Sequence, residues 1–288
     1  MADTCYREVT ISKAAADWVD RPNDWVALLL PGMTLNATIF PDLGIPTVAP
    51  DFSTLRLGED GASRELAVDG MAVYAGLLDE LLQADDRWAA ARRVVVAHSF
   101  GGMLALRWLL EHRCSGLAAV AGMVLVATTA GPMFDRVSLR LLGVQELELR
   151  LGIRFLMGLW NRPAVTRLMK RLTSGGNMEA AAVDFQSLGI TSDLELDIAG
   201  WRNTDWRAMR SYRLALAGFD VREKLGDIRV PTIVLHGTND SLFEPEVARE
   251  LAGGLPHAEL RLVPGAGHAL TLTHRNAVIE AVRDLQRG

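Results

Sequence analysis

Hydrophobic positions along the chain form two patterns that alternate. Short runs in which almost every residue is apolar are typical of strands buried in a parallel sheet, and longer stretches with an apolar residue every three or four positions are typical of helices. Strands are expected at residues 7–12, 26–30, 47–50, 94–97, 123–127, 232–236 and 259–263, and helices at residues 66–82, 104–110, 245–251 and 276–286. This alternation predicts an α/β fold, with a mostly parallel central sheet and helices on both faces.

The pattern changes between residues 131 and 206. This segment has Leu, Met, Arg and Trp at helical intervals and no convincing buried strand, and Pro163 and Gly200 interrupt it. A chain of 288 residues can bury one large core. We therefore expect a core built from residues 1–130 and 207–288, with residues 131–206 inserted as a helical unit.

Composition and charge exclude several classes of protein. With 49% hydrophobic and 23% charged residues, the sequence is typical of a soluble globular protein. A net charge of -5 gives no electrostatic signature of binding to nucleic acid or to an anionic membrane. The two cysteines, Cys5 and Cys114, provide neither a disulfide framework nor a metal-ligand spacing, and the acidic N-terminus does not resemble a secretory signal. A cytoplasmic location is the resulting expectation.

One uncharged stretch, residues 114–134, is long enough to span a bilayer, which takes about 20 residues. Glycine, threonine and proline interrupt this stretch, and only residues 123–127 are continuously apolar. We therefore expect a buried central strand here rather than a membrane helix.

Ser99 lies where a predicted strand ends and a predicted helix begins, in the sequence Ala97-His98-Ser99-Phe100-Gly101. A serine in such a tight turn adopts a strained backbone conformation, exposes its hydroxyl group and leaves the next N–H free to donate. Ser99 is therefore a candidate nucleophile. The alternative is an ordinary strand-to-helix connection in which the serine has no chemical role.

A serine nucleophile requires a base, and the base requires an acid that orients it. Asp240 follows the strand predicted at residues 232–236, and His268 follows the strand predicted at residues 259–263. Because sites in open parallel sheets gather at the carboxyl ends of strands, we expect Ser99, Asp240 and His268 to meet at one edge of the sheet.

Other polar residues compete for these roles or are interpreted as structural. His274 is a rival base, and Glu244 and Asp227 are rival acids. A structural role is expected for His98, His112, His236 and Cys114.

Together these features resemble the α/β-hydrolase fold family, and in particular its members with a helical cap between the sixth and seventh strands. The resemblance extends over nearly the whole chain, through the Pro31-Gly32-Met33 turn, the turn at Ser99, the insertion, the Asp240 loop and the Gly265-Ala266-Gly267-His268 loop. It implies that Ser99, Asp240 and His268 are catalytic and that the backbone N–H groups of Met33 and Phe100 bind the oxyanion. It implies no cofactor and no metal.

Two positions depart from the family pattern. The turn at the nucleophile is usually G-x-S-x-G, and Ala97 replaces its first glycine. The oxyanion turn usually begins His-Gly, and this chain has Pro31-Gly32. We expect both changes to be tolerated, because a methyl group is small and the oxyanion donors are backbone N–H groups.

The expected activity is a serine hydrolase that cleaves small or medium carboxylic esters through an acyl-enzyme. A thioesterase, a C–C bond hydrolase, a cofactor-free peroxidase-like member and a non-catalytic ligand-binding member are the alternatives. The expected partner is a small-molecule ester, without nucleic acid or membrane, and the oligomeric state is left open.

Substrate choice is expected to depend on the inserted helices. Two interpretations are open for their aromatic and Met side chains, which either line the pocket or only pack the helices together. These residues are Phe134, Phe155, Met157, Trp160, Met169, Trp201 and Trp206. Their arginines bind an anionic group or simply face solvent: Arg140, Arg150, Arg154, Arg162, Arg167 and Arg171.

Overall fold

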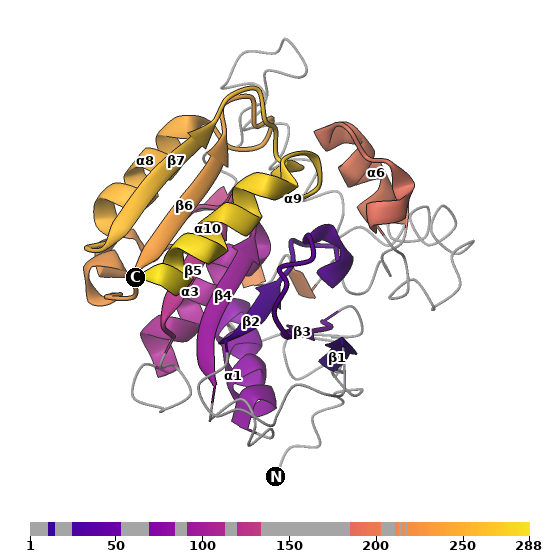
Figure 1. Cartoon of the computed structure of the whole chain (residues 1–288). Coiled ribbons are helices and arrows are strands. Elements are labelled where there is room, and N and C mark those ends of the chain that lie inside the picture. Colours follow the sequence, from indigo (N-terminus) through magenta and orange to yellow (C-terminus); the bar gives the residue numbers. More distant parts are fainter. Residues whose placement is uncertain are drawn as a thin grey trace, which may run out of the picture.

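A single sheet of seven strands organises the computed structural model of the chain (Figure 1). The structure describes residues 11–14, 25–52, 69–83, 91–112, 120–133, 185–202, 211–212, 215–216 and 218–288. The strands are β1 (Ile11–Ala14), β2 (Trp25–Leu30), β3 (Thr47–Pro50), β4 (Arg92–His98), β5 (Gly122–Val126), β6 (Thr232–Gly237) and β7 (Ala258–Val263). Their order in the sheet is β1-β3-β2-β4-β5-β6-β7, and only β1 runs antiparallel to its neighbour. The prediction of a mostly parallel sheet is confirmed.

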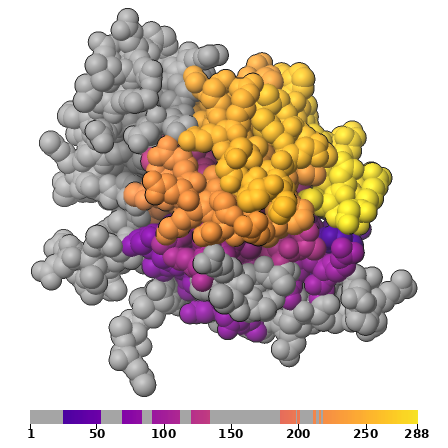
Figure 2. Space-filling view, turned by 90° about the vertical axis from the view of Figure 1, so that its left-hand side faces the viewer, coloured from indigo at the N-terminus to yellow at the C-terminus, as the bar shows by residue number. Residues whose placement is uncertain are grey.

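Helices cover both faces of the sheet. They are α1 (Gly70–Gln83), α3 (Phe100–His112), α6 (Asp193–Arg202), α8 (Pro245–Gly254), α9 (Leu270–Thr273) and α10 (Arg275–Arg287), with the short 3-10 helices η1 (Ala37–Ile39), η7 (Phe185–Leu188) and η8 (Arg222–Asp227). In Figure 2, the C-terminal part of the chain, orange to yellow, lies directly against segments of the N-terminal half, violet to magenta. The two halves of the sequence therefore enclose one core.

Alternate residues of each central strand enter two separate apolar clusters. In β2, Val26, Leu28 and Leu30 pack with α1, α3 and α8, whereas Ala27 and Leu29 pack on the other face with α9 and α10. Both sets are almost completely buried. This explains the continuous apolar runs in the sequence, since a strand buried on both faces has no polar side.

The order of the strands determines where a site can form. The chain passes from β2 to β3 on one side, and then crosses back to β4 on the other side of β2. Loops that leave the carboxyl ends of β2 and β4 consequently turn toward opposite faces of the sheet. The turn at Pro31 follows β2 and the turn at Ser99 follows β4.

Several predicted boundaries are corrected. The strand expected to end at residue 127 stops at Val126, because Ala127 has a left-handed φ of 48°. The helix expected from residue 104 already begins at Phe100, since a single residue, Ser99, makes the turn. The short helices η1, η8 and α9 were not predicted, because three to six residues are too few to show a period.

The expected insertion falls between β5 and β6, the strands predicted at residues 123–127 and 232–236. Of the inserted segment, η7 and α6 are described, and the boundary expected at residue 206 lies outside the described residues. The extent of the insertion therefore stays a prediction. The candidate side chains at residues 134–171, Trp206, Cys5 and Cys114 also lie outside them, and α6 includes Trp201 without a described side chain.

No helix within the described ranges is long and apolar enough to cross a membrane.

Close contact between two backbones at the turn predicts a strong effect of one methyl group. A Cβ atom at Gly101 would overlap the carbonyl group of Leu30 and the carbonyl oxygen of Pro31. Both are backbone atoms that cannot rotate away. We expect Gly101→Ala to lower the free energy of unfolding by about 3 kcal/mol or more, measured by urea denaturation.

Gly76→Ala is the matched control. Gly76 lies inside α1, and a Cβ atom there would meet no atom within 4 Å. Alanine should stabilise the helix at this position by about 0.5–1 kcal/mol. Equal stability of the two variants would contradict the close contact at Gly101.

Candidate active site

The backbone at Ser99 is strained and held from both sides. Its φ is 52°, in the left-handed region, which costs a non-glycine residue about 1–2 kcal/mol. The Ser99 N–H donates to the carbonyl oxygen of Val126 at 2.9 Å, and the Ser99 carbonyl accepts from the Thr128 hydroxyl at 2.6 Å. These contacts with the chain at and after β5 fix the direction of the serine side chain.

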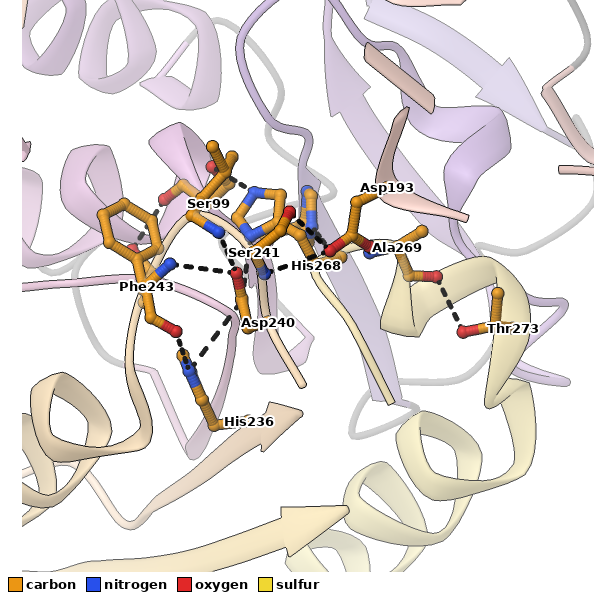
Figure 3. A network of polar contacts seen from close by, with 12 residues as sticks. Ser99, Asp193, His236, Asp240, Ser241, Phe243, His268, Ala269 and Thr273 are labelled. Carbon is orange, nitrogen blue, oxygen red and sulfur yellow. Dashed lines mark hydrogen bonds and ion pairs between the residues drawn. The ribbon is translucent and has the colours of Figure 1, made fainter. Parts of the chain in front are cut away.

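The structure brings Ser99, His268 and Asp240 together from three loops (Figure 3). Nε2 of His268 lies 3.0 Å from Oγ of Ser99, and Nδ1 of His268 lies 2.9 Å from Oδ2 of Asp240. In the neutral state the imidazole thus donates from Nδ1 to the carboxylate and accepts the serine proton at Nε2.

Asp240 is held by the backbone that follows it. Its Oδ1 accepts from the N–H groups of Leu242 at 2.8 Å and Phe243 at 3.0 Å, which leaves Oδ2 directed at His268. The carboxylate therefore has partners on both oxygens and a fixed orientation toward the imidazole.

Opposite charges dominate the electrostatics of this pair. Burial alone would lower the pKa of His268, but the charge of Asp240 and the hydrogen bond between them raise it above the ordinary value. Burial likewise opposes ionisation of Asp240, yet the charge of His268 and the bonds that Asp240 accepts lower the Asp240 pKa. The raised pKa of His268 and the lowered pKa of Asp240 both favour an imidazolium beside a carboxylate.

Two further histidines near the site bind backbone carbonyls. Nε2 of His98 donates to the carbonyl oxygen of His268 at 2.9 Å, and Nε2 of His236 donates to that of Phe243 at 3.0 Å. Both side chains are fully buried. Burial, followed by the charge of His268, lowers the pKa of His98 to about 3, and burial lowers the pKa of His236. Both histidines are therefore neutral, and each holds one loop of the site through its hydrogen bond to a backbone carbonyl.

The rival residues lie elsewhere. His274 follows α9, and its Nδ1 contacts the Thr273 hydroxyl at 2.9 Å. Glu244 occupies the position before the first residue of α8, and Asp227 ends η8. The hydrogen-bonding partner of His268 Nδ1 is Asp240.

The Pro31-Gly32-Met33 turn lies beside Ser99. The carbonyl groups at the end of β2 approach Gly101, two residues after Ser99. Phe100 is the first residue of α3, where backbone N–H groups have no partner within the helix. The resemblance assigns oxyanion binding to the N–H groups of Met33 and Phe100, and these two residues therefore lie in adjacent turns.

An apolar cavity that is partly open to solvent adjoins both turns. Phe100 and Tyr212 form its aromatic wall, with ring centroids 5.0 Å apart and nearly perpendicular rings. The lining consists of Leu30, Pro31, Gly32, Leu35, Pro50, Phe52, Phe100, Leu104 and Tyr212.

Sequence reasoning missed two acids on α6, Asp193 and Asp197. Asp193 accepts hydrogen bonds from Ser241 and Ala269, which directly follow Asp240 and His268. Burial raises the pKa of Asp197, while the charge of His268 opposes that shift. Their spacing of four residues puts both on one side of the helix, but no pattern in the sequence shows what that side faces.

Within the described ranges, no group of three or more His, Cys, Asp or Glu side chains is arranged to hold a metal ion.

A model of the Alpha/beta hydrolase family matches residues 27–281. The pimeloyl-[acyl-carrier protein] methyl ester esterase of Nitrosomonas europaea is 26% identical over 209 residues, which are 73% of this chain and 74% of that protein. The polyketide synthase ThaQ of Burkholderia thailandensis is 42% identical over 71 residues, which are 25% of this chain and 3% of that protein. The chain spans 30% or less of the length of the first three curated relatives it matches.

Solved structures share the fold. A hydrolase from Oleispira antarctica has a TM-score of 0.64 and 18% identity, with 97% of this chain and 94% of that chain covered. MenH from S. aureus has a TM-score of 0.61 and 17% identity, with 96% and 97% covered. At these identities the comparison supports the architecture alone.

His98 should make the protein sensitive to acid. Below pH 6.5 the unfolded chain protonates this histidine, whereas the folded protein does so only near its lowered pKa of about 3. Unfolding thus takes up a proton, and stability falls as the pH falls. Between pH 8 and 5 the loss should be about 2 kcal/mol.

We expect His98→Gln, whose amide can still donate toward the His268 carbonyl, to reduce this pH dependence. The free energy of unfolding is measured by urea denaturation between pH 5 and 8. The values at pH 8, where the histidine is neutral in both states, correct for any general effect of the substitution. The same slope in both proteins would contradict the prediction.

Proposed function

The chain belongs to the alpha/beta hydrolase family, and we propose that it is a serine hydrolase that cleaves small or medium carboxylic esters. One observation carries the proposal. Ser99 Oγ, both ring nitrogens of His268 and the Asp240 carboxylate form a continuous chain of hydrogen bonds of 3.0 and 2.9 Å. Relatives that carry esterase names support an ester as the substrate.

The first half of the reaction acylates Ser99. Ser99 Oγ attacks the acyl carbon while Nε2 of His268 takes the hydroxyl proton, and Asp240 stabilises the imidazolium. When the tetrahedral intermediate collapses, the bond to the alkoxy oxygen breaks and His268 returns the proton to the leaving alcohol. Water then attacks the acyl-enzyme by the same route, which releases the acid and restores Ser99.

The N–H groups of Met33 and Phe100 are the proposed oxyanion donors. The two turns that carry them adjoin each other at the end of β2 and the start of α3. Donors fixed by the fold need no reorganisation when charge develops, and each contributes about 3 kcal/mol to stabilising the transition state.

The apolar cavity supports an uncharged hydrocarbon group on the substrate. Gly32, which precedes the proposed donor Met33, and Phe100, the other proposed donor, line this cavity. A group attached to the reacting carbon would therefore enter it directly. We assign the cavity to the acyl chain of the ester.

Labelling with a fluorophosphonate probe tests the nucleophile. The wild-type protein should react, and Ser99→Ala should not, because the probe requires an activated serine. His268→Ala should lose at least about 10⁴-fold in ester turnover, since the proton then has no acceptor. Mass spectrometry of the labelled protein identifies the modified residue.

His274→Ala is the control, and it should retain labelling and turnover. A folded wild-type protein that refuses the probe would favour a ligand-binding role over hydrolysis. Panels of p-nitrophenyl esters, acyl thioesters and vinylogous diketones separate the remaining substrate classes. Turnover of thioesters or diketones without turnover of any simple ester would overturn the ester assignment.

The cavity predicts a preference along a series of p-nitrophenyl esters. Each buried methylene contributes about 0.8 kcal/mol, so kcat/KM should rise about fourfold per carbon from acetate to butyrate. Leu35→Phe narrows the cavity and should remove this gain while leaving acetate turnover nearly unchanged. An unchanged butyrate-to-acetate ratio in Leu35→Phe would place the acyl chain elsewhere.

A further inference from the structure

One carboxylate of the inserted helix α6 binds both loops that carry the base and the acid (Figure 3). Oδ2 of Asp193 accepts from the N–H of Ser241 at 3.2 Å and from its hydroxyl at 2.8 Å. Oδ1 accepts from the N–H of Ala269 at 2.8 Å. Asp193 thus connects the residue after Asp240 to the residue after His268.

The His268 loop is built to let this carboxylate approach. A Cβ atom at Gly267 would lie 2.5 Å from Oδ1 of Asp193, closer than any real Cβ contact. Only glycine at this position leaves room for the bond from the Ala269 N–H to Asp193. The absence of a side chain at Gly267 therefore allows the loop backbone and the Asp193 carboxylate to lie in close contact.

The rest of α6 places Asp193 over the site. Leu196 is 2% exposed and belongs to the apolar cluster on the α10 face of the sheet. Gly200 packs against Thr34 and Leu35, just after the proposed oxyanion turn. Residues 193, 196 and 200 share one face of a helix. Through that face, α6 contacts the loops of the acid and the base at one end and the oxyanion turn at the other.

We propose that Asp193 is a positioning residue, which fixes His268 and Asp240 relative to each other and to the inserted helix. The inference rests on the proposed function, because it assigns to Asp193 the alignment of the base for that reaction. Displacing a catalytic group by about 1 Å costs about 10²-fold in rate. Three hydrogen bonds from a carboxylate to two loops restrict such a displacement.

The charge of Asp193 also acts on the base. Burial lowers the pKa of His268, and the charge of Asp193 helps to raise it, after the charge of Asp240 and the hydrogen bond to Asp240. Charged and titratable groups face His268 from several elements: His98 at the end of β4, His236 and Asp240 at and after the end of β6, and Asp193 and Asp197 on α6.

Asp193→Asn tests the proposal in the full-length protein. One carbonyl oxygen cannot accept from both loops, and the amide N–H₂ would face a backbone N–H that also donates. We expect kcat on p-nitrophenyl butyrate to fall about 10- to 100-fold with a smaller change in KM. The acidic limb of the kcat/KM profile should move to lower pH, because the imidazolium loses a neighbouring negative charge.

Glu195→Gln and Ser241→Ala are matched controls. Glu195 lies on the same helix, is exposed, and bonds to Thr191 rather than to the site. Its neutralisation removes the same charge and should change neither kcat nor the pH limb. Ser241→Ala removes one hydroxyl donor and keeps the charge, so it should lower kcat severalfold without shifting the limb.

NMR titration of the His268 imidazole gives a second readout that does not require turnover. Asp193→Asn should lower the pKa of His268, whether or not the wild-type protein hydrolyses an ester. Absence of ester hydrolysis by the wild-type protein would contradict the proposed function but not this effect of Asp193. Unchanged kcat, or reduced kcat with an unshifted His268 titration, would overturn the proposal. If Asp193→Asn does not fold, Ser241→Ala tests the proposal instead. A kcat equal to that of the wild type in Ser241→Ala would then contradict the positioning role of Asp193.

Discussion

The contact between the turn at Ser99 and the end of β2 is the constraint on which the rest of the site depends. The backbone of Gly101 lies against the carbonyl groups of Leu30 and Pro31, and Ser99 takes a left-handed conformation to allow it. Hydrogen bonds to Val126 and from Thr128 hold that conformation in place. The strain is local, and the parallel strands on both sides of β4 stabilise it. Ala97 is fully buried in the core at the position where the family pattern has glycine.

Around this turn, buried polar groups hold one another in a fixed protonation pattern. His98 donates to the backbone of the His268 loop, and His236 donates to the backbone of the Asp240 loop. Both are neutral because burial disfavours their charged forms, whereas His268 gains a proton more readily beside Asp240. The fold therefore separates three buried histidines into two that support the loops and one that can exchange a proton with Ser99.

The sequence allowed the sheet and the approach of Ser99, Asp240 and His268 to be predicted because each follows a strand with a clear apolar pattern. Strand ends of a parallel sheet share one edge, so local patterns were enough to bring distant residues together. Asp193 could not be found in this way. Its bond to Ala269 joins residues 76 positions apart, and it depends on how an inserted helix docks on the loops. The spacing of apolar residues in α6 indicates a helix but carries no information about that docking.

This difference separates two kinds of residue in the site. Ser99, His268 and Asp240 belong to loops that the sheet itself places, and the same arrangement is compatible with several hydrolytic reactions. Helix α6 contacts these loops through Asp193, and it contacts Thr34 and Leu35, which follow the Pro31-Gly32-Met33 turn, through Gly200. Because these contacts connect α6 to the His268 loop and to the residues after the Pro31-Gly32-Met33 turn, a shift of the helix would displace one relative to the other. The position of α6 is therefore coupled to the relative positions of Asp240 and His268.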